Sequence, residues 1–488
     1  MTHAETTTET TLANEERITG DLAGRKVLFI AYFFPPTVST GVPGSQRTVK
    51  FLRNLSNGEC HVLTVPANVS DQDNALRHLS LPVNGEIIHR VAPWDMFKAL
   101  LSVRKRVKGL FKRGASPVGT SETPVASQPA QSVFRSGSDT QDTRSAFQKL
   151  KDFIYDLCYF PDQAGPWILP ATRYGKKLVR QHDIDVIFAT GSPWSGLITG
   201  YLISKATGKP LIVDFRDPWM DNPFHQSKGR LLDSWASKLE RKVVNHASAV
   251  SLNTPPLRDA FIARYPDIEA ERFFVMPNGF DPSEGVSESH KESTPPDTLV
   301  LCHTGFLYGV RDPAPLLEAI REANKVLEEN RKKVCLVQVG AINLSYDICH
   351  RFEDLTQANA LVLKGKLSQE ECVNIQAQAD ILVNIQPFTK TQVPSKLYEY
   401  LAPRKAIFNI TPKDGALGKI VTEDGLGGLF EGSDNTELTG SLIELALDKT
   451  QLTKYAPINI DKYRVDRITS VLSNKIIGIS GRVPNAQH

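Results

Sequence analysis

Short hydrophobic runs rich in β-branched residues alternate with segments of helical periodicity along most of this chain of 488 residues. A run that is apolar on both faces is typical of a strand buried in a parallel sheet, and the helices between such runs supply the crossover connections. The runs form two series, separated by the polar, proline-containing residues 283–297. The pattern predicts an α/β fold with two Rossmann-like, doubly wound parallel-sheet domains that face a central cleft.

Several segments of biased composition lie outside the expected strands and helices. The N-terminal tail is rich in Thr and Glu, and a later segment is rich in Ser, Thr, Gln and Pro, so we expect both to be disordered. We expect the last segment to pack back on the first domain. The expected order is a tail at 1–25, a first domain at 26–282 with a disordered insertion at 114–145, a linker at 283–297, a second domain at 298–456 and a C-terminal segment at 457–488.

The overall composition excludes some classes of protein. With 41% hydrophobic and 23% charged residues the chain is globular, and it is too long for a single hydrophobic core. Its formal net charge of +3 argues against a nucleic-acid partner. The six cysteines lack C-x-x-C spacing, which favours reduced thiols and gives no zinc pattern. No apolar run reaches the ~20 residues that cross a bilayer, so we expect a soluble or peripheral protein. The reduced thiols favour the cytoplasm.

Residues 97–113 mix Phe, Leu and Val with seven Lys and Arg residues. At helical spacing the apolar side chains can share one side of the segment, with the basic ones around them. A basic amphipathic helix predicts binding to an anionic membrane surface, here the inner face of the cell membrane. An ordinary surface helix leading into a linker is the open alternative.

A glycine-containing loop follows the first expected strand, residues 26–34. In a doubly wound sheet this loop lies where ligands bind, so Gly41 and Gly44 are candidates for a loop that approaches the acceptor or a phosphate. Turn geometry alone is an equally open interpretation. The loop lacks the G-x-G-x-x-G pattern, so the sequence gives no dinucleotide-binding fingerprint.

A strand-turn-helix unit in the second half points to a nucleotide. The apolar run at 380–387 predicts a buried strand, and Pro394 and Ser395 are residue types that begin a helix. Free amides and the helix dipole at such a helix start favour phosphate, and Glu399, one turn later, is placed to accept hydrogen bonds from a ribose diol. The unit therefore predicts a nucleotide-sugar site. A solvated glutamate on an ordinary helix is the alternative.

Charged residues also follow a strand of the first series. Asp214, Arg216 and Asp217 stand at its carboxyl end, where catalytic side chains collect in such folds. We take Asp217 as the candidate carboxylate that orients or deprotonates an acceptor hydroxyl, with Arg216 as its catalytic neighbour. The same group also fits a structural knot of ion pairs, which is the interpretation we favour for Asp214.

Five short motifs, in this order and spacing, resemble those of family 4 glycosyltransferases, a group that builds polysaccharides and glycolipids from nucleotide sugars. The motifs are FFPP at 33–36, VDFRDPW at 213–219, PNGFD at 277–281, HTG at 303–305 and PSKLYEYL at 394–401. The resemblance spans the chain outside the tail and the insertion. It implies the GT-B fold, with the acceptor bound by the first domain and the nucleotide sugar by the second.

The resemblance assigns the phosphate-binding residues of the donor site. It implies that Gly305 ends the first strand of the second domain close to the diphosphate, and that Arg311, six positions later, contacts that anion. A basic residue usually follows this glycine directly, but this chain has Phe306. Lys396 is the candidate that supplies the missing charge, with a solvated lysine as the alternative.

The resemblance also assigns the residues around the nucleoside and the sugar. Glu399 matches the second glutamate of the E-x7-E motif, which grips the ribose hydroxyls, and Ser395 lies in the same motif. Thr391 stands where the first glutamate, which helps to hold the donor sugar, is expected. Lys366 lies at a strand end that resembles the one meeting the base. Because Thr391 departs from the pattern, the sugar and the stereochemical outcome stay open.

The sequence thus predicts a glycosyltransferase that moves a sugar from a UDP- or GDP-linked donor to a polysaccharide or lipid-linked acceptor. The resemblance implies a retaining reaction. No metal is expected, because Asp71-Gln-Asp73 lies in a loop unsuited to a metal-binding D-x-D motif. The nucleotide sugar is a co-substrate, and no other cofactor is expected. Two alternatives remain: an epimerase or hydrolase of sugar nucleotides on the same scaffold, and a non-catalytic scaffold that binds sugar nucleotides.

Overall fold

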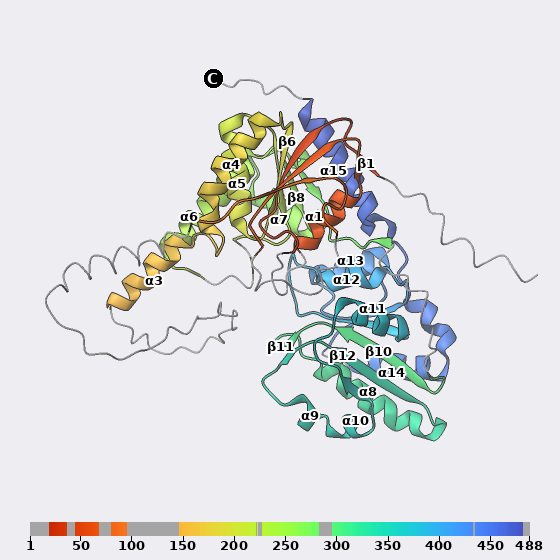
Figure 1. The fold of residues 1–488 in the computed structure, drawn as a ribbon. Helices are drawn as coiled ribbons and strands as arrows, with labels where there is room; N and C mark the ends of the chain where they lie inside the picture. The colour runs from red at the N-terminus through yellow and green to blue at the C-terminus, as the bar shows by residue number, and fades with distance from the viewer. Residues whose placement is uncertain are drawn as a thin grey trace, which may run out of the picture.

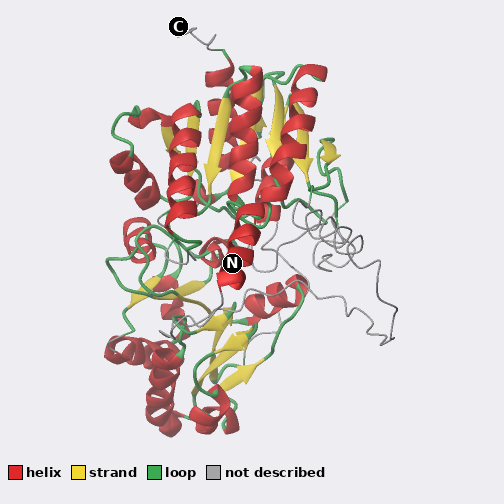
Figure 2. Ribbon diagram, turned by 90° about the vertical axis from the view of Figure 1, so that its left-hand side faces the viewer, coloured by secondary structure: helices red, strands yellow, loops and turns green. Residues whose placement is uncertain are grey.

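The computed structural model describes residues 19–36, 44–67, 80–94, 146–220, 222, 227–282, 295–432 and 435–481. Two large parallel sheets flanked by helices build two domains, one beyond the other along the molecule (Figure 1, Figure 2). Each sheet is covered by a hydrophobic cluster on both faces. The predicted α/β fold with two doubly wound domains is therefore confirmed.

The first sheet has seven strands in the order β5-β4-β2-β6-β7-β8-β9, all parallel. The strand order reverses between β2 and β6, which places a crevice at their carboxyl ends. The strands are β2 (Lys26–Ile30), β4 (Glu59–Thr64), β5 (Ile87–Arg90), β6 (Val186–Gly191), β7 (Leu211–Phe215), β8 (Ala249–Leu252) and β9 (Phe273–Val275).

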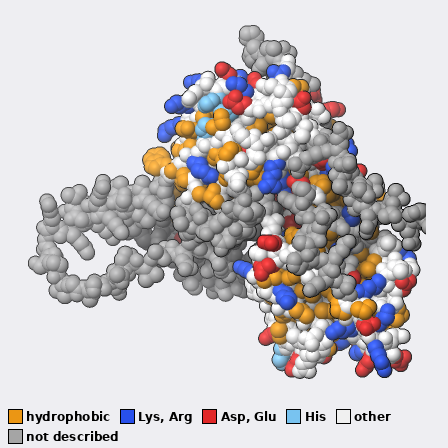
Figure 3. Space-filling view, turned by 45° about the vertical axis from the view of Figure 1, so that its right-hand side comes forward, with side chains coloured by type: hydrophobic (Ala, Val, Ile, Leu, Met, Phe, Trp, Pro, Cys, Tyr) orange, Lys and Arg blue, Asp and Glu red, His pale blue; other side chains and the backbone are white. Residues whose placement is uncertain are grey.

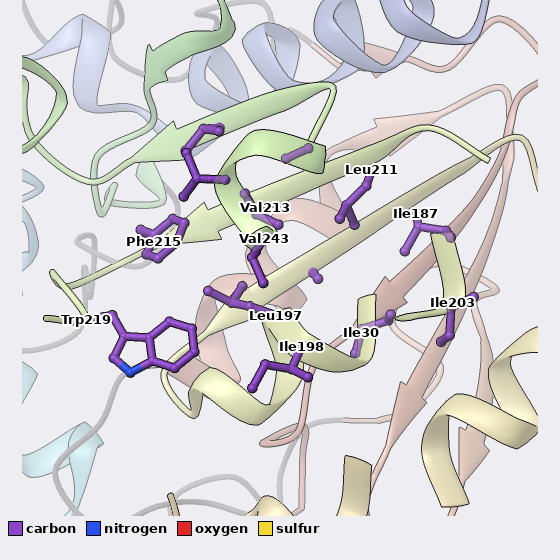
Figure 4. Packing of buried hydrophobic residues seen from close by; sticks show 14 of the residues in the cluster. Ile30, Ile187, Leu197, Ile198, Ile203, Leu211, Val213, Phe215, Trp219 and Val243 are labelled. Atoms are coloured by element: carbon purple, nitrogen blue, oxygen red, sulfur yellow. The ribbon is translucent and has the colours of Figure 1, made fainter. Parts of the chain in front are cut away.

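Alternate residues of these strands enter opposite hydrophobic clusters, as the period of two in a strand requires. On one face Leu211, Val213 and Phe215 of β7 lie beside Leu197 and other helical residues (Figure 4). The helices are α1 (Gly44–Arg53), α3 (Ala146–Cys158), α4 (Ile168–Gln181), α5 (Trp194–Thr207), α6 (Arg230–His246) and α7 (Pro255–Arg264).

The second sheet has six parallel strands in the order β14-β12-β10-β15-β16-β17, with its reversal between β10 and β15. A small pair, β11 (Leu307–Tyr308) with β13 (Ile342–Asn343), extends beyond β10 and β12. The other strands are β10 (Thr298–Thr304), β12 (Lys333–Val339), β14 (Leu361–Leu363), β15 (Ile381–Ile385), β16 (Ala406–Ile410) and β17 (Gly428–Phe430). The helices are α8 (Ala314–Leu327), α9 (Ile348–Arg351), α10 (Glu353–Gln357), α11 (Gln369–Gln378), α12 (Ser395–Leu401), α13 (Ala416–Asp424) and α14 (Asn435–Leu447).

The prediction of a disordered tail is wrong over residues 19–25. Residues Gly20–Asp21 form β1, which pairs in parallel with β3 (Leu55–Ser56). Leu22 is buried in the same cluster as Phe29. Burial of this one leucine and the β1–β3 pairing tie the segment to the first domain, although its composition resembles that of a disordered chain.

After the second domain the chain returns to the first. Helix α15 (Val465–Ser480) contacts β1 and α1 (Figure 1), and its Ile468, Leu472 and Ile476 belong to the hydrophobic cluster of Phe29. Backbone hydrogen bonds between Phe280 and residues 463 and 465 join the two segments that pass between the domains.

Several predictions fall outside the described residues. These are Gly41, the basic segment 97–113, the insertion 114–145, the Asp71-Gln-Asp73 loop and residues 283–294 of the expected linker. Among the helices that are described, none combines the length and the apolar character needed to cross a membrane.

Candidate functional site

The crevice of the second sheet lies where the chain leaves β10 and β15. Arg311, which follows β11, donates from Nη2 to the side-chain oxygen of Gln386, just after β15, over 2.9 Å. Its guanidinium also lies over the Tyr308 ring, 5.4 Å from the centroid. Ligands of doubly wound sheets bind at this point of reversed strand order, so Arg311 is held in a position suited to a ligand.

The guanidinium of Arg311 keeps donors to spare. In the described part of the chain no carboxylate pairs with it, and its buried Nε has no hydrogen-bond acceptor. A planar guanidinium with free donors is suited to two-point contact with a phosphate or carboxylate. An anion at this position would use a donor, Nε, that the described residues leave without a partner.

His303 is a buried residue of β10. Its Nδ1 lies 2.7 Å from the side-chain oxygen of Gln338. Burial lowers the pKa of His303 to about 4, and the positive charges of Arg311 and Lys396 act in the same direction despite the Gln338 hydrogen bond. The charges of both residues predicted to bind the diphosphate thus act on His303, although 85 positions separate the two in the sequence.

The ends of β10 and β12 meet through glycine. Gly305 donates to the Val339 carbonyl over 2.8 Å and accepts from the Gln338 side chain over 2.9 Å. Gly340 has a φ of +128°, and a Cβ there would lie 2.2 Å from the Gly305 carbonyl oxygen. Only glycine fits this contact. Gly340 was not among the predicted site residues, although a glycine at the end of an expected strand was an available signal.

Helix α12 is fixed against β10 by its buried tyrosine. The Tyr400 hydroxyl accepts from the Thr304 amide over 2.9 Å and lies 3.0 Å from the Thr304 hydroxyl. Pro394 precedes the helix and Ser395 is its first residue, but no side chain caps it. Pro394 is the N-cap residue of this helix, and the role of Ser395 at the donor site stays a prediction.

Lys396 and Glu399 form an ion pair on the open side of α12, with 2.5 Å between Nζ and Oε2. Both side chains are more than one-third exposed. Burial by itself lowers the pKa of Lys396. The charge and the hydrogen bond of the Glu399 carboxylate act in the other direction, and the pKa of Lys396 is raised as a result. The ion pair keeps Lys396 charged and holds its side chain beside Glu399. The geometry permits Lys396 to bind a phosphate, and this role stays a prediction.

Helix α12, which carries Ser395 and Glu399, lies on the side of the second domain next to the first (Figure 1). They line a small pocket together with Arg47, Lys50 and Asn278. Glu399 is therefore accessible from the boundary between the domains, where the predicted ribose contact would have to form.

Lys366 and the glycine loop are the remaining predicted positions. Lys366 is exposed in the loop after β14, and the neighbouring Gly365 carbonyl accepts from the Gly340 amide over 2.6 Å. This bond brings the loop of Lys366 next to the ends of β10 and β12. Gly44 is the first residue of α1. The roles of Lys366 and Gly44 stay predictions.

A buried ion pair supports the first domain at the boundary. Arg47 of α1 makes two bonds to Asp214 of β7, of 2.9 and 3.1 Å, and both side chains are buried. Asp214 also accepts from Thr190 and Ser251 over 2.8 Å each. With its oxygens engaged in this way, Asp214 is the structural residue that we favoured from the sequence. Its partner Arg47 carried no signal in the sequence.

Arg216 is buried against the end of β6. Its Nε donates to the Gly191 carbonyl over 3.0 Å, and its Nη2 donates to the Ser192 carbonyl. This guanidinium holds the carboxyl end of β6 in the crevice of the first sheet. Arg216 would therefore contribute to catalysis only by positioning the backbone at the end of β6.

Asp217 lies at a contact between the domains. Its Oδ1 accepts from the side-chain amide of Gln392 over 3.0 Å, and the Thr254 hydroxyl donates to the Thr391 carbonyl over 2.6 Å. A cleft between the domains is lined by Arg258 of the first and by Thr391 and Lys419 of the second. Thr391 thus faces the first domain, while the role of Asp217 stays a prediction.

Two doubly wound domains, with the ends of their parallel strands directed at a common boundary, define the GT-B fold of glycosyltransferases. Residues 137–284 match the family model described as Glycosyltransferase Family 4. The match falls on the first domain and confirms the resemblance that the sequence motifs indicated. A comparison with curated protein sequences gave no match.

Solved structures of the same fold cover almost the whole chain. The N-terminal domain of Candida albicans trehalose-6-phosphate phosphatase is 12% identical with a TM-score of 0.54, covering 96% of this chain and 98% of that chain. An E. coli structure described as trehalose-6-phosphate bound with UDP-2-fluoro glucose is 11% identical with a TM-score of 0.51, covering 95% and 100%. The lipopolysaccharide outer core galactosyltransferase WaaB, in its apo form, is 13% identical with a TM-score of 0.51, covering 93% and 99%.

Proposed function

We propose that this protein is a glycosyltransferase that moves a sugar from a nucleotide-diphosphate sugar to a hydroxyl group of a polysaccharide or lipid-linked acceptor. The observation that carries the proposal is the Arg311 guanidinium, which lies at the crevice of the second sheet without a carboxylate partner among the described residues. In this proposal Arg311 and Lys396 bind the diphosphate, and Glu399 accepts hydrogen bonds from the ribose.

The proposed reaction is retaining and needs no metal from the protein. The bond between the anomeric carbon and the phosphate oxygen breaks, and a bond from the same carbon to the acceptor oxygen forms on the same face. The acceptor proton passes to the departing phosphate oxygen. Arg311 and Lys396 stabilise the charge that develops on the diphosphate, so catalysis rests on electrostatic stabilisation and positioning. Loss of turnover in EDTA, restored by Mg²⁺ or Mn²⁺, would contradict this part.

We propose a uracil nucleotide as the first donor to test, with a guanine nucleotide as the second. The E. coli structure of the same fold is described as bound with UDP-2-fluoro glucose, which supports this order. Thr391, at the place of the first motif glutamate, leaves the donor sugar to be found by experiment.

We further propose that the enzyme works in the cytoplasm at an anionic membrane surface. Helix α4 supports this because Arg173, Lys177 and Arg180, spaced along one side, are exposed on it. Leu169 and Tyr174 of the same helix are also exposed. Such a surface would bring the enzyme to a lipid-linked acceptor.

A thermal-shift panel tests the donor proposal. Wild type is compared with Arg311→Ala, and Lys325→Ala is the control because Lys325 is an exposed cation of the second domain that pairs with Glu322. A rise in Tm with one nucleotide class, lost in Arg311→Ala and kept in the control, is the expected result. No shift with UDP, GDP or ADP would contradict the proposal. Consumption of the donor without any acceptor would instead favour a hydrolase or epimerase, and binding without turnover would favour a scaffold.

A further inference from the structure

Three histidines that the proposed reaction does not use come together in the first domain. They are His61 of β4, His89 of β5 and His182, which directly follows α4. One ring nitrogen from each lies within 4.8 Å of the other two. His61 Nδ1 and His89 Nε2 are 3.0 Å apart, and the His61 and His182 ring centroids are 4.4 Å apart. Nitrogens at such separations need only small shifts to share one metal ion.

The second nitrogen of His61 has a partner typical of a metal ligand. His61 Nε2 lies 2.6 Å from the Glu59 carboxylate. When this nitrogen carries the proton, Nδ1 presents its lone pair toward the other two histidines. A carboxylate that orients a ligating imidazole in this way is the usual second partner of a metal-bound histidine. Lys26 Nζ, 3.6 Å from the same carboxylate, keeps Glu59 in place.

We propose that His61, His89 and His182 bind a divalent transition-metal ion of the zinc type. Three neutral imidazoles suit Zn²⁺, and water or another small ligand would complete a tetrahedron. His61 is fully buried, whereas His89 and His182 are partly exposed, which gives an ion a path from solvent. The hydrogen bond between His61 Nδ1 and His89 Nε2 would break when the ion binds between the two nitrogens.

The site lies away from the boundary between the domains. His182 precedes β6 and lies at the amino end of that strand, whereas His61 and His89 are the third residues of β4 and β5. Figure 3 shows histidine side chains at the surface of the first domain, at its end away from the second. A metal here is independent of the proposed donor site and of the metal-free transfer reaction.

The bound ion would hold an edge strand. It would join β4, the edge strand β5 and the end of α4, which are separate elements around one corner of the sheet. Arg90, next to His89, donates to the Pro35 and Val65 carbonyls at the opposite end of the sheet over 2.6 and 3.1 Å. The ion would therefore fix both β5 and the backbone that leads into the first ligand loop.

Metal titration of the full chain tests the proposal. The protein is stripped with a chelator, exchanged into metal-free buffer and titrated with Co²⁺, whose visible absorption reports a tetrahedral site, and then with competing Zn²⁺. We expect one ion per chain at this site and a rise in Tm. His182→Asn and His89→Asn should each abolish the tetrahedral spectrum. Glu59→Gln should keep the stoichiometry but weaken binding by about 10- to 100-fold.

His350→Asn is the matched control, because His350 belongs to the short helix α9 of the second domain. It should bind Co²⁺ and Zn²⁺ as wild type does. Circular dichroism of each variant, recorded without metal, separates loss of ligands from loss of fold. The proposal is overturned if the stripped wild type gives no tetrahedral Co²⁺ spectrum at micromolar ion, or if folded His182→Asn and His89→Asn bind as tightly as wild type.

Discussion

The Arg311 guanidinium is joined to the Gln386 side chain by a 2.9 Å hydrogen bond that crosses the crevice between the ends of β10 and β15. A neutral partner orients the arginine without cancelling its charge, in contrast to Lys396, which is paired with Glu399. The crevice therefore holds one cation that is uncompensated by a carboxylate of the described residues and one that is compensated. We therefore expect substitutions at Arg311 to affect ligand binding differently from substitutions in the Lys396–Glu399 pair.

Glu399→Ala should separate the recognition of ribose from that of phosphate. Because the change removes the proposed ribose acceptor, we expect UDP or GDP to bind about 10- to 100-fold more weakly. Pyrophosphate lacks the ribose, and Lys396 loses its competing carboxylate, so pyrophosphate binding should be unchanged or stronger. Calorimetry of both ligands measures this, with Arg311→Ala, which should weaken both, as the comparison. Equal weakening of UDP and pyrophosphate in Glu399→Ala would contradict the ribose role.

Asp217 and Gln392 allow a catalytic carboxylate to be distinguished from a domain contact. Asp217→Asn removes the charge, whereas Gln392→Ala breaks the same 3.0 Å hydrogen bond and leaves the carboxylate in place. If Asp217 orients the acceptor hydroxyl, Asp217→Asn should lower kcat by about 100-fold or more with the donor KM unchanged, and Gln392→Ala should stay near wild type. Similar losses in both variants would make Asp217 a structural contact only.

The buried Arg47–Asp214 pair should stabilise the first domain only as a complete pair. Arg47→Met leaves the buried Asp214 carboxylate without its counter-charge, so we expect a loss of about 3 to 5 kcal/mol in the free energy of unfolding. Replacing both residues, with Arg47→Met and Asp214→Leu together, should recover part of that loss. Urea unfolding followed by circular dichroism measures it. A single variant as stable as wild type would show that the pair does not support the domain.

His303 should make stability depend on pH in the mildly acidic range. Burial lowers its pKa from 6.5 to about 4 in the folded protein. The unfolded chain therefore binds a proton first, so the contribution is present above pH 6.5 and is lost as the pH falls toward 4. The loss should reach about 3 kcal/mol. Unfolding of His303→Asn should show a smaller slope between these pH values, while His350→Asn should keep the wild-type slope.

Charge reversal on α4 tests the proposed membrane contact. Arg173→Glu with Lys177→Glu should weaken flotation with anionic vesicles at low salt, since each basic residue near the surface contributes about 1 kcal/mol. Neutral vesicles should bind neither protein. Lys325→Glu with Lys454→Glu, on the second domain, makes the same change of charge elsewhere. If that control lost as much flotation, net charge alone would explain the effect.

Local patterns made the two sheets predictable and supplied the candidate residues of the donor site. The buried strands appear in the sequence as apolar runs. Gly305 and Glu399 belong to short motifs, and Arg311 stands at a fixed spacing from Gly305. The pairing of Arg47 with Asp214 links residues 167 positions apart, so no local pattern encodes it. The same holds for His61, His89 and His182, which meet only because β4, β5 and the end of α4 share one corner. Leu22 was missed because a single buried leucine hardly changes the composition of a polar tail.

The return of α15 to the first domain has a consequence for synthesis. Ile468, Leu472 and Ile476 belong to the same hydrophobic cluster as Val27 and Phe29, yet the ribosome makes them after the whole second domain. The hydrophobic core of the first domain is therefore complete only when α15 packs on it. The half of the protein that is translated first thus depends on a helix that is translated after the whole second domain.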